Sequence, residues 1–308
     1  MPNSESNFLR TILLLSVCFA FSGTTSSLTV SASSLVGYGI ADNKALATLP
    51  LSFHLLGTML AGIPASLLMK RVGRRYGFMI GTGIGASGAA AATIAIIYSN
   101  FVFFCMSIFL LGILSGFSQL YRFTAADVAR PEFRTKAVSL VIFGGILAGF
   151  IGPTIAAKAK DLIADAPFAG SYLFVIMFHV VIVAILFMIR LPQPSLEEQT
   201  GKSRPWREIF SQPKFIVAVL TSMVGYGVMA MIMTATPLAM TVGSGHPFSD
   251  AAFVIQWHVV GMFAPSFFTG SLIHRFGAVP IIISGILLNL LCIGINFAEL
   301  LCSIIGLP

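Results

Sequence analysis

Nine apolar stretches, each long enough to cross a bilayer, run along the chain between short polar turns. A helix needs about 20 residues to span the hydrocarbon core, and these stretches meet that length. Because lipid offers no partner for an unpaired backbone group, we predict that each stretch forms a helix. The stretches lie near 9–36, 45–69, 77–98, 101–126, 137–158, 167–190, 214–240, 249–273 and 279–302.

One long polar segment, 191–212, interrupts this pattern. Its prolines and charged side chains prevent a membrane span, so we predict a cytoplasmic linker with a short interfacial helix around residues 206–210. The linker would separate an N-terminal six-helix bundle at 1–190 from a partial C-terminal bundle of three helices at 213–308.

Composition supports an integral membrane protein. Hydrophobic residues make up 56% of the chain and charged residues only 9%, whereas a soluble domain carries about 25% charged residues. The net charge of +7 does not indicate a nucleic-acid partner, because excess Lys and Arg in a membrane protein mostly set its orientation. The cysteines lie in apolar stretches without a CxxC motif, so we predict no metal site and no cofactor. They are Cys18, Cys105, Cys292 and Cys302.

Basic residues occupy alternate loops. Four of them follow the second predicted helix, and others follow the fourth, the sixth and the eighth, whereas the opposite loops hold only Lys44, Lys158 and Lys160. Because positive loops stay in the cytoplasm, we predict a cytoplasmic N-terminus. The chain would be a multi-pass protein of the cell (inner or plasma) membrane, with the lipid bilayer as a partner.

A weak internal repeat relates the two parts of the chain. Residues 54–73 reappear 204 positions later as 258–277, with five of twenty aligned positions identical. A restarted pattern in a membrane protein favours a transporter. The identical pairs are His54 and His258, Gly57 and Gly261, Leu68 and Leu272, Arg71 and Arg275, and Gly73 and Gly277.

Six helices, a linker and a restarted set resemble the major facilitator superfamily. Its signature between helices 2 and 3 reads Gly-x-Leu-x-Asp-Arg-x-Gly-Arg-Arg/Lys, whereas Lys70 and His274 replace the aspartate here. In the family that aspartate helps to latch the cytoplasmic gate. Alternatively, the basic residues are only positive-inside anchors. The resemblance assigns a gating motif to Lys70, Arg71, Gly73, Arg74, Arg75, Gly270, Arg275 and Gly277.

The resemblance implies an all-α integral membrane bundle built from two repeats of six helices, the second of them truncated, with about nine transmembrane helices. The family has twelve, and the match ends after the ninth. We expect either a truncated or frameshifted product or a partner that supplies the rest, and the first is favoured.

The fifth predicted helix resembles the glycine-rich helix 5 of drug/proton antiporters in this superfamily. Small residues let helices approach closely, and a proline bends a helix. Close packing without any implied direction of transport is the alternative. The motif residues are Gly145, Gly149, Gly152 and Pro153.

Polar side chains inside a span are costly and therefore mark candidate functional positions. The repeat relates His54 to His258, and either could bind substrate or carry a proton, or instead bond to a neighbouring helix as structure. Arg122 could pair with Asp127, contact an anionic solute or reach the head groups; Asp127 itself is expected to gate or cap. The remaining candidates for substrate binding are Tyr226, Gln256 and Trp257.

These observations predict a secondary transporter that moves a small organic solute by alternating access, with protons as the coupling ion. The alternatives are an inactive relic of a transporter and a non-transporting sensor or assembly protein. We do not expect an enzyme, since His54, His179 and His258 lack a nucleophile or acid beside them.

Overall fold

The computed structural model describes residues 2–189, 191 and 205–305, and its regular structure there is helical. Short 3-10 turns precede α2 and α6, and a π-helical turn follows α10. The helices are α1 (Pro2–Ile40), α2 (Leu49–Val72), α3 (Arg74–Ile97), α4 (Phe101–Ser118), α5 (Tyr121–Val128), α6 (Arg134–Ala159), α7 (Ala169–Met188), α9 (Trp206–Phe210), α10 (Pro213–Leu238), α11 (Phe248–Phe263), α12 (Ser266–Phe276) and α13 (Ala278–Ile305).

The predicted nine spans are confirmed: within the described residues, nine helical segments are long and apolar enough to cross a membrane. Two of the predicted helices are each divided. The 101–126 span breaks between α4 and α5, where the Leu120 N–H bonds the Phe117 carbonyl in a turn. The 249–273 span breaks between α11 and α12, where Pro265 has no N–H to continue the helix.

The contacts divide the chain into two compact units, Met1–Phe263 and Ala264–Pro308. The first holds α1 to α11, and the second holds the hairpin of α12 and α13. A short helix, α9, lies where an interfacial helix is predicted, whereas most of the 191–212 linker, with 190 before it, falls outside the described residues. The division into bundles at 1–190 and 213–308 stays a prediction.

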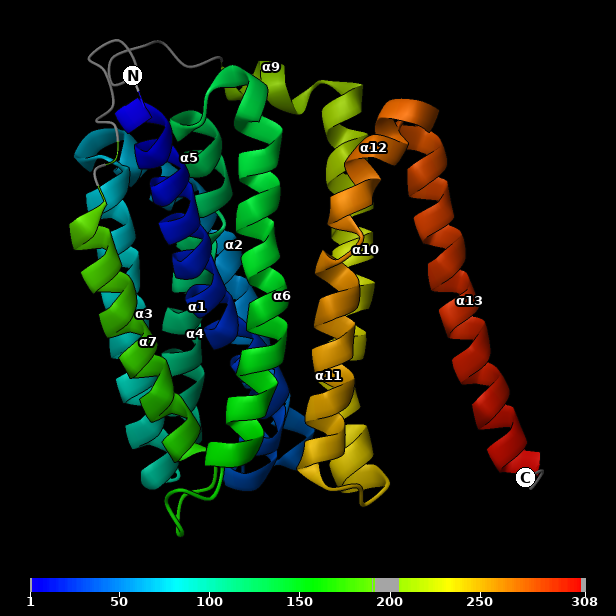
Figure 1. Cartoon of the computed structure of the whole chain (residues 1–308). Helices are drawn as coiled ribbons and strands as arrows, with labels where there is room; N and C mark the ends of the chain where they lie inside the picture. The colour runs from blue at the N-terminus through cyan, green and yellow to red at the C-terminus, as the bar shows by residue number, and fades with distance from the viewer. Residues whose placement is uncertain (1, 190, 192–204, 306–308) are drawn as a thin grey trace. The chain divides into compact units, whose positions relative to one another are not determined.

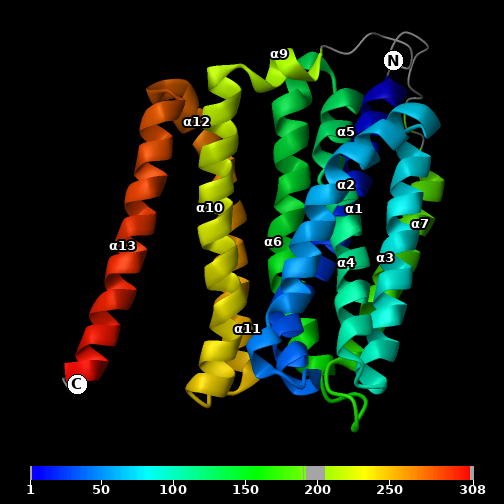
Figure 2. The same ribbon diagram turned by 180° about the vertical axis from the view of Figure 1, so that it is seen from behind.

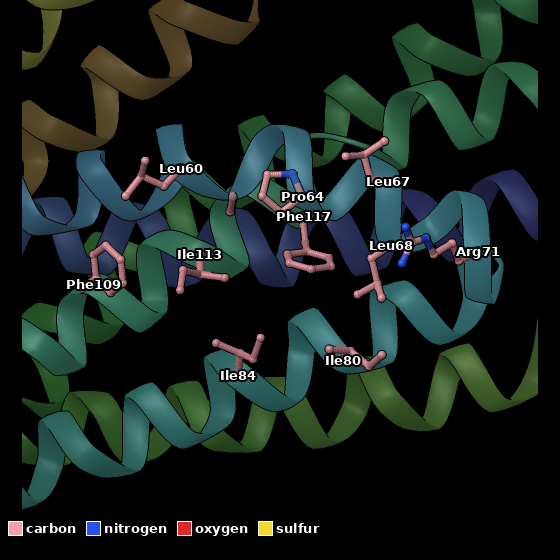
Figure 3. A pocket seen from close by; sticks show the side chains of 11 residues that line it. Leu60, Pro64, Leu67, Leu68, Arg71, Ile80, Ile84, Phe109, Ile113 and Phe117 are labelled. Carbon is pink, nitrogen blue, oxygen red and sulfur yellow. The ribbon is translucent and has the colours of Figure 1, made fainter. Parts of the chain in front are cut away.

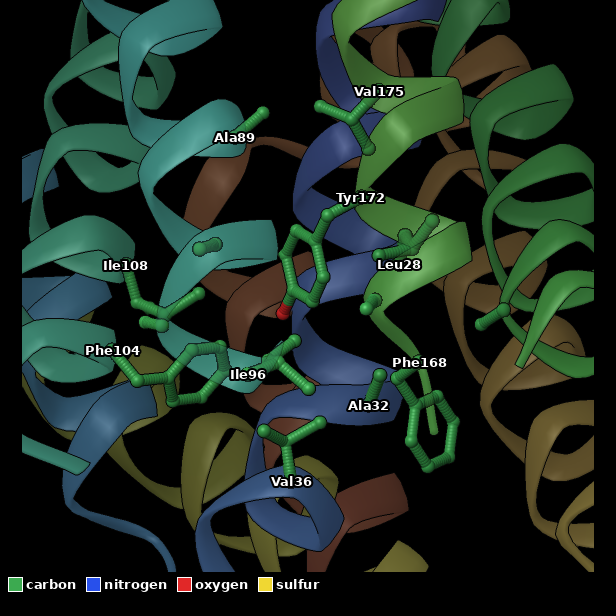
Figure 4. Packing of buried hydrophobic residues seen from close by; sticks show 14 of the residues in the cluster. Leu28, Ala32, Val36, Ala89, Ile96, Phe104, Ile108, Phe168, Tyr172 and Val175 are labelled. Carbon is green, nitrogen blue, oxygen red and sulfur yellow. The ribbon is translucent and has the colours of Figure 1, made fainter. Parts of the chain in front are cut away.

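Helix α1 is the central element of the first unit, packed along α6 and against α4, α7 and α10 (Figure 1). On the other side, α2 and α3 each pack on α4, so these three helices lie side by side (Figure 2). Buried side chains of α1, α3, α4 and α7 fill the space between them. Figure 4 shows Tyr172 at the centre of this cluster, with the Phe104 ring edge-on at 6.0 Å between centroids.

The hydroxyl-rich face of α1 is buried between its neighbouring helices. Thr24 donates to the Ala20 carbonyl at 2.8 Å, and Ser31 donates to the Ser27 carbonyl at 2.9 Å. Thr25 and Ser33 bond the preceding turn in the same way, whereas the Ser22, Ser27 and Thr29 hydroxyls are buried without such a bond. The buried members are Ser22, Thr24, Thr25, Ser27, Thr29, Ser31, Ser33 and Ser34.

The repeat detected in the sequence has a backbone counterpart at two glycines. Gly73 ends α2 with φ 87° and ψ 155°, and Gly277 ends α12 with φ 85° and ψ 164°. Each N–H bonds the carbonyl four residues earlier, at 3.0 Å and 2.8 Å respectively. Only glycine adopts this region without strain. The two turns therefore share one conformation 204 residues apart.

We expect Gly73→Ala to lower the free energy of unfolding by about 1–3 kcal/mol, because a Cβ is strained at this φ. Gly62→Ala is the matched control, since its new methyl meets nothing within 4 Å. Thermal unfolding in detergent would show a lower midpoint for Gly73→Ala alone. Equal midpoints for the two variants would contradict the strained-turn interpretation.

Candidate functional site

Three helices of the first unit meet at a polar cluster of Ser26, His54 and Ser115. The Ser115 hydroxyl lies 2.7 Å from the Ser26 hydroxyl and 3.3 Å from Nε2 of His54. It also lies 3.2 Å from the Leu111 carbonyl of its own helix. His54 and Ser115 are buried, at 4% and 5% exposure. The cluster therefore joins α1, α2 and α4 through side chains that exchange hydrogen-bond roles.

Close backbone contact between α2 and α4 holds this cluster. A Cβ at Gly112 would lie 2.1 Å from the His54 carbonyl oxygen, and a Cβ at Gly57 would lie 2.4 Å from the Phe109 carbonyl oxygen. The Thr58 hydroxyl lies 2.9 Å from the His54 carbonyl and 3.1 Å from the Gly112 carbonyl. Because both helices present glycine at the crossing, the imidazole of His54 reaches α4 directly.

Nδ1 of His54 is buried without a hydrogen-bond partner. One ring nitrogen is therefore bonded, and the other is buried and unsatisfied. A buried polar atom without a partner costs free energy and often accompanies a functional role.

In the first copy of the gating motif, Arg74 and Arg75 connect the α2–α3 turn to α5 and α7. Arg74 forms an ion pair with Asp127 and donates to the Thr124 hydroxyl at 3.1 Å, both on α5. Arg75 donates to the Phe187 carbonyl at 2.9 Å, in the last turn of α7. A cation at that position meets the negative end of the helix dipole.

These contacts lie within the first unit, whereas the resemblance implied that the motif latches the two halves together. Arg74 and Arg75 bind helices of the same predicted bundle. Arg71 is exposed, and Lys70 lies half-buried in the last turn of α2. The motif arginines thus set the position of α5 and α7 against the α2–α3 turn.

Arg122 does not pair with Asp127, whose carboxylate is engaged by Arg74. Its guanidinium lies over the Phe123 ring, 5.0 Å from the centroid, and its Nε is buried without a partner. The charge therefore sits half-buried in α5, stabilised by an aromatic face, rather than in an ion pair.

The glycines of α6 divide between two neighbours. A Cβ at Gly145 would lie 2.8 Å from the Phe263 ring, and one at Gly149 would lie 2.8 Å from Val259, both on α11. Gly152 faces α1 instead, where its Cβ would lie 2.8 Å from the Thr24 carbonyl oxygen. The close-packing role is thus observed. Pro153 follows inside α6 and is buried.

The candidate substrate-binding residues on α10 and α11 are more exposed to solvent than His54. The Trp257 ring packs edge-on against Phe150 of α6 at 6.0 Å and is 52% exposed. Tyr226 is 55% exposed on α10. His258 is half-buried with its Nε2 unpartnered, and Gln256 is half-buried beside it. The structure places these residues on accessible helix faces, apart from the hydrogen bonds of the His54 cluster.

The second copy of the gating motif lies in the second unit. Gly270 and Arg275 are on α12, and Gly277 ends it. The Arg275 guanidinium lies over the neighbouring Phe276 ring at 5.3 Å.

Sequence reasoning missed Ser115 and Thr124, the hydroxyl partners of His54 and Arg74. One signal was present: Gly112 and Gly116 form a Gly-x-x-x-Gly pair on α4, a spacing typical of closely packed membrane helices. It could have indicated that Ser115, between them, lies at a helix–helix contact.

Comparison with known proteins agrees with this architecture. The Major Facilitator Superfamily profile matches residues 13–306. The chain is 38% identical over 283 residues to the riboflavin transporter RfnT of Brucella anthropi, covering 91% of this chain and 70% of RfnT. It is 25% identical to the uncharacterized MFS-type transporter YdeG of Bacillus subtilis, covering 91% of this chain and 68% of YdeG.

A solved structure shows the same fold. The Escherichia coli fucose:proton symporter FucP aligns with a TM-score of 0.56 at 18% identity, over 88% of this chain and 72% of FucP. The all-helical bundle, the nine apolar spans and the matched profile agree with one another. The chain belongs to the Major Facilitator Superfamily of membrane transporters.

Proposed function

We propose that this protein carries riboflavin, or a closely similar planar heteroaromatic solute, across the cell membrane by alternating access, driven by a proton gradient. The observation that carries the proposal is the 38% identity to a riboflavin transporter over 91% of this chain. We further propose that the N-terminus is cytoplasmic, because the basic loops flank the even-numbered spans.

The accessible aromatic side chains suit such a solute. Trp257 and Tyr226 are each more than half exposed, and Gln256 offers both a donor and an acceptor beside Trp257. A flat ring system with a polar edge binds by stacking on aromatic faces and by a few oriented hydrogen bonds. These residues would provide both kinds of contact.

Two further features support alternating access with protons. The Phe263 and Val259 side chains of α11 pack directly on Gly145 and Gly149, so α6 places no side chain of its own between the two helices at these positions. His54 supplies a group that can change protonation inside the bundle, linked to α1 and α4 through Ser115. Proton movement at His54 would thereby bias the packing of three helices.

Proteoliposomes containing the purified chain test the proposal. Riboflavin trapped in the lumen is measured by its own fluorescence after external dye is removed, with and without a pH gradient. We expect accumulation above the level of protein-free liposomes and its collapse when a protonophore is added. Absence of flux under every gradient would overturn the proposal, and riboflavin binding without flux would favour a sensor.

Trp257→Ala checks the substrate contacts in the same assay. We expect the riboflavin concentration for half-maximal uptake to rise about tenfold, since loss of stacking costs about 0.5–1.5 kcal/mol beyond lost buried area. Phe103→Ala is the control, an exposed aromatic on α4, because Phe253 on α11 packs against the Trp257 ring itself. An equal rise in both variants would remove Trp257 from the proposed site.

A further inference from the structure

An apolar groove of about 600 Å³ runs along the outside of α2, α3 and α4. Figure 3 shows Leu60 and Pro64 of α2 above it, Ile113 of α4 at its floor, and Ile84 of α3 below it. Its volume lies within the range of about 300–1,000 Å³ that holds small ligands in proteins. All its lining residues are apolar except Arg71, at one end.

The groove lies on the face of α4 opposite the polar cluster. Ser115 points toward Ser26 of α1, and Ile113 and Phe117 are each two residues away. Two residues turn an α-helix by about 200°, so these side chains point away from α1. Leu60 and Leu67 of the groove are also more than half exposed. The groove therefore belongs to the outer apolar surface of the bundle rather than to the His54 site.

Arg71 gives the groove a charged end. Its side chain is exposed in the last turn of α2, and the guanidinium reaches back toward Leu68 (Figure 3). The neighbouring Arg74 and Arg75 are engaged by Asp127 and by the Phe187 carbonyl. Arg71 is thus the arginine of this turn that faces the groove with its donors available for an anion.

The length of the groove matches one leaflet. Leu60 and Arg71 are eleven residues apart on α2, which corresponds to about 16 Å along the helix. Half of the ~30 Å hydrocarbon core is about 15 Å. An apolar occupant that lies along α2 from Leu60 would therefore reach the head-group level where the guanidinium is placed.

We propose that this groove holds one acyl chain of an anionic phospholipid, whose phosphate is bound by Arg71. The apolar walls would contact the acyl chain, and Arg71 would bind the negative phosphodiester. The distance from Leu60 to Arg71 along α2 allows one lipid to make both contacts. The site is separate from the transported solute and does not depend on its identity.

Photoactivatable phosphatidylglycerol, with a diazirine in the acyl chain, tests this in nanodiscs that contain the full chain. We expect adducts on peptides of α2, α3 and α4 that include Leu60, Ile84 or Ile113. A matched phosphatidylcholine probe should give a lower yield at the same peptides, because it carries no net negative charge. Adducts confined to other helices, or links between two copies of the chain across the groove, would overturn the proposal.

Two variants distinguish the contribution of the head group to lipid binding from that of the acyl chain. Arg71→Gln should lower the phosphatidylglycerol yield about fivefold, since one basic residue near the surface contributes about 1 kcal/mol. It should lower the phosphatidylcholine yield less, because the choline cation offsets the charge of the same phosphodiester. Ile113→Trp should lower both yields by filling the groove. Arg134→Gln, an exposed arginine elsewhere, is the control and should change neither. Equal yields from Arg71→Gln and Arg134→Gln would rule out phosphate binding by Arg71.

Discussion

Replacing Gly112 with leucine is expected to abolish accumulation of the folded chain in the membrane. Even a Cβ at this position would lie 2.1 Å from the His54 carbonyl oxygen, which is backbone and cannot move aside. Overpacking costs about 1–3 kcal/mol in ordinary cores, and a forced separation of two helices costs more. Because total stability is only about 5–15 kcal/mol, this change removes a large share of it.

Gly83→Leu is the matched control for Gly112→Leu. Gly83 is exposed on α3, and an added Cβ meets nothing within 4 Å. Size-exclusion chromatography of a fluorescent fusion would show a monodisperse peak for Gly83→Leu and its loss for Gly112→Leu. Normal yield and unfolding midpoint for Gly112→Leu would mean that α2 and α4 do not cross as closely as described.

Replacing His54 with leucine is expected to lower riboflavin uptake about tenfold or more while the chain still inserts. The change removes the imidazole proposed to carry the proton, while the Ser115 hydroxyl keeps its contacts with Ser26 and the Leu111 carbonyl, so the folded bundle is retained. His54→Gln separates two roles, because glutamine keeps a hydrogen bond but cannot titrate. We expect His54→Gln to keep solute exchange between equal pools and to lose accumulation driven by a pH gradient.

His179→Leu is the control for these variants. His179 is a second buried imidazole, on α7, whose ring nitrogens make no hydrogen bond to Ser26, His54 or Ser115, so its replacement leaves that cluster intact. Uptake initial rates, corrected for reconstituted protein, decide the comparison. Gradient-driven accumulation by His54→Gln at the unmodified level would exclude His54 as the proton carrier and leave it a structural residue.

The spans could be predicted because the bilayer demands a long apolar helix wherever the chain crosses. The breaks within two of them could not be located. Pro265 sits at one break, yet prolines also occur inside intact helices here, at Pro64 and Pro153. Whether a proline ends a helix depends on neighbours that re-satisfy the freed carbonyl, which the local sequence does not contain.

One of the three residues of the polar cluster, His54, could be identified as a candidate from the sequence. His54 was conspicuous because a histidine in an apolar span is costly. Ser115 was not, since a serine can satisfy its hydroxyl on its own helix, as Ser31 and Ser33 of α1 do. Only the crossing of α2 with α4 distinguishes Ser115, and that crossing is a tertiary contact.

For the gating motif, the residues were identified but not the geometry. Arg74 meets an acidic group, Asp127, and Arg75 meets a helix end at the Phe187 carbonyl. The contacts of both arginines within one predicted bundle could not be foreseen, because the sequence of a basic loop does not determine which helix ends next to it.

The spacing of these contacts along the chain also has a consequence for biosynthesis. Asp127 follows Arg74 by 53 residues, and Phe187 follows Arg75 by 112. At about 5–20 residues per second, the ribosome adds Phe187 roughly 6 to 22 seconds after Arg75. Arg74 meets its partner first, and Arg75 waits longer for the Phe187 carbonyl. Under the proposed orientation, the same side chains would hold this loop in the cytoplasm during insertion and brace the finished bundle afterwards.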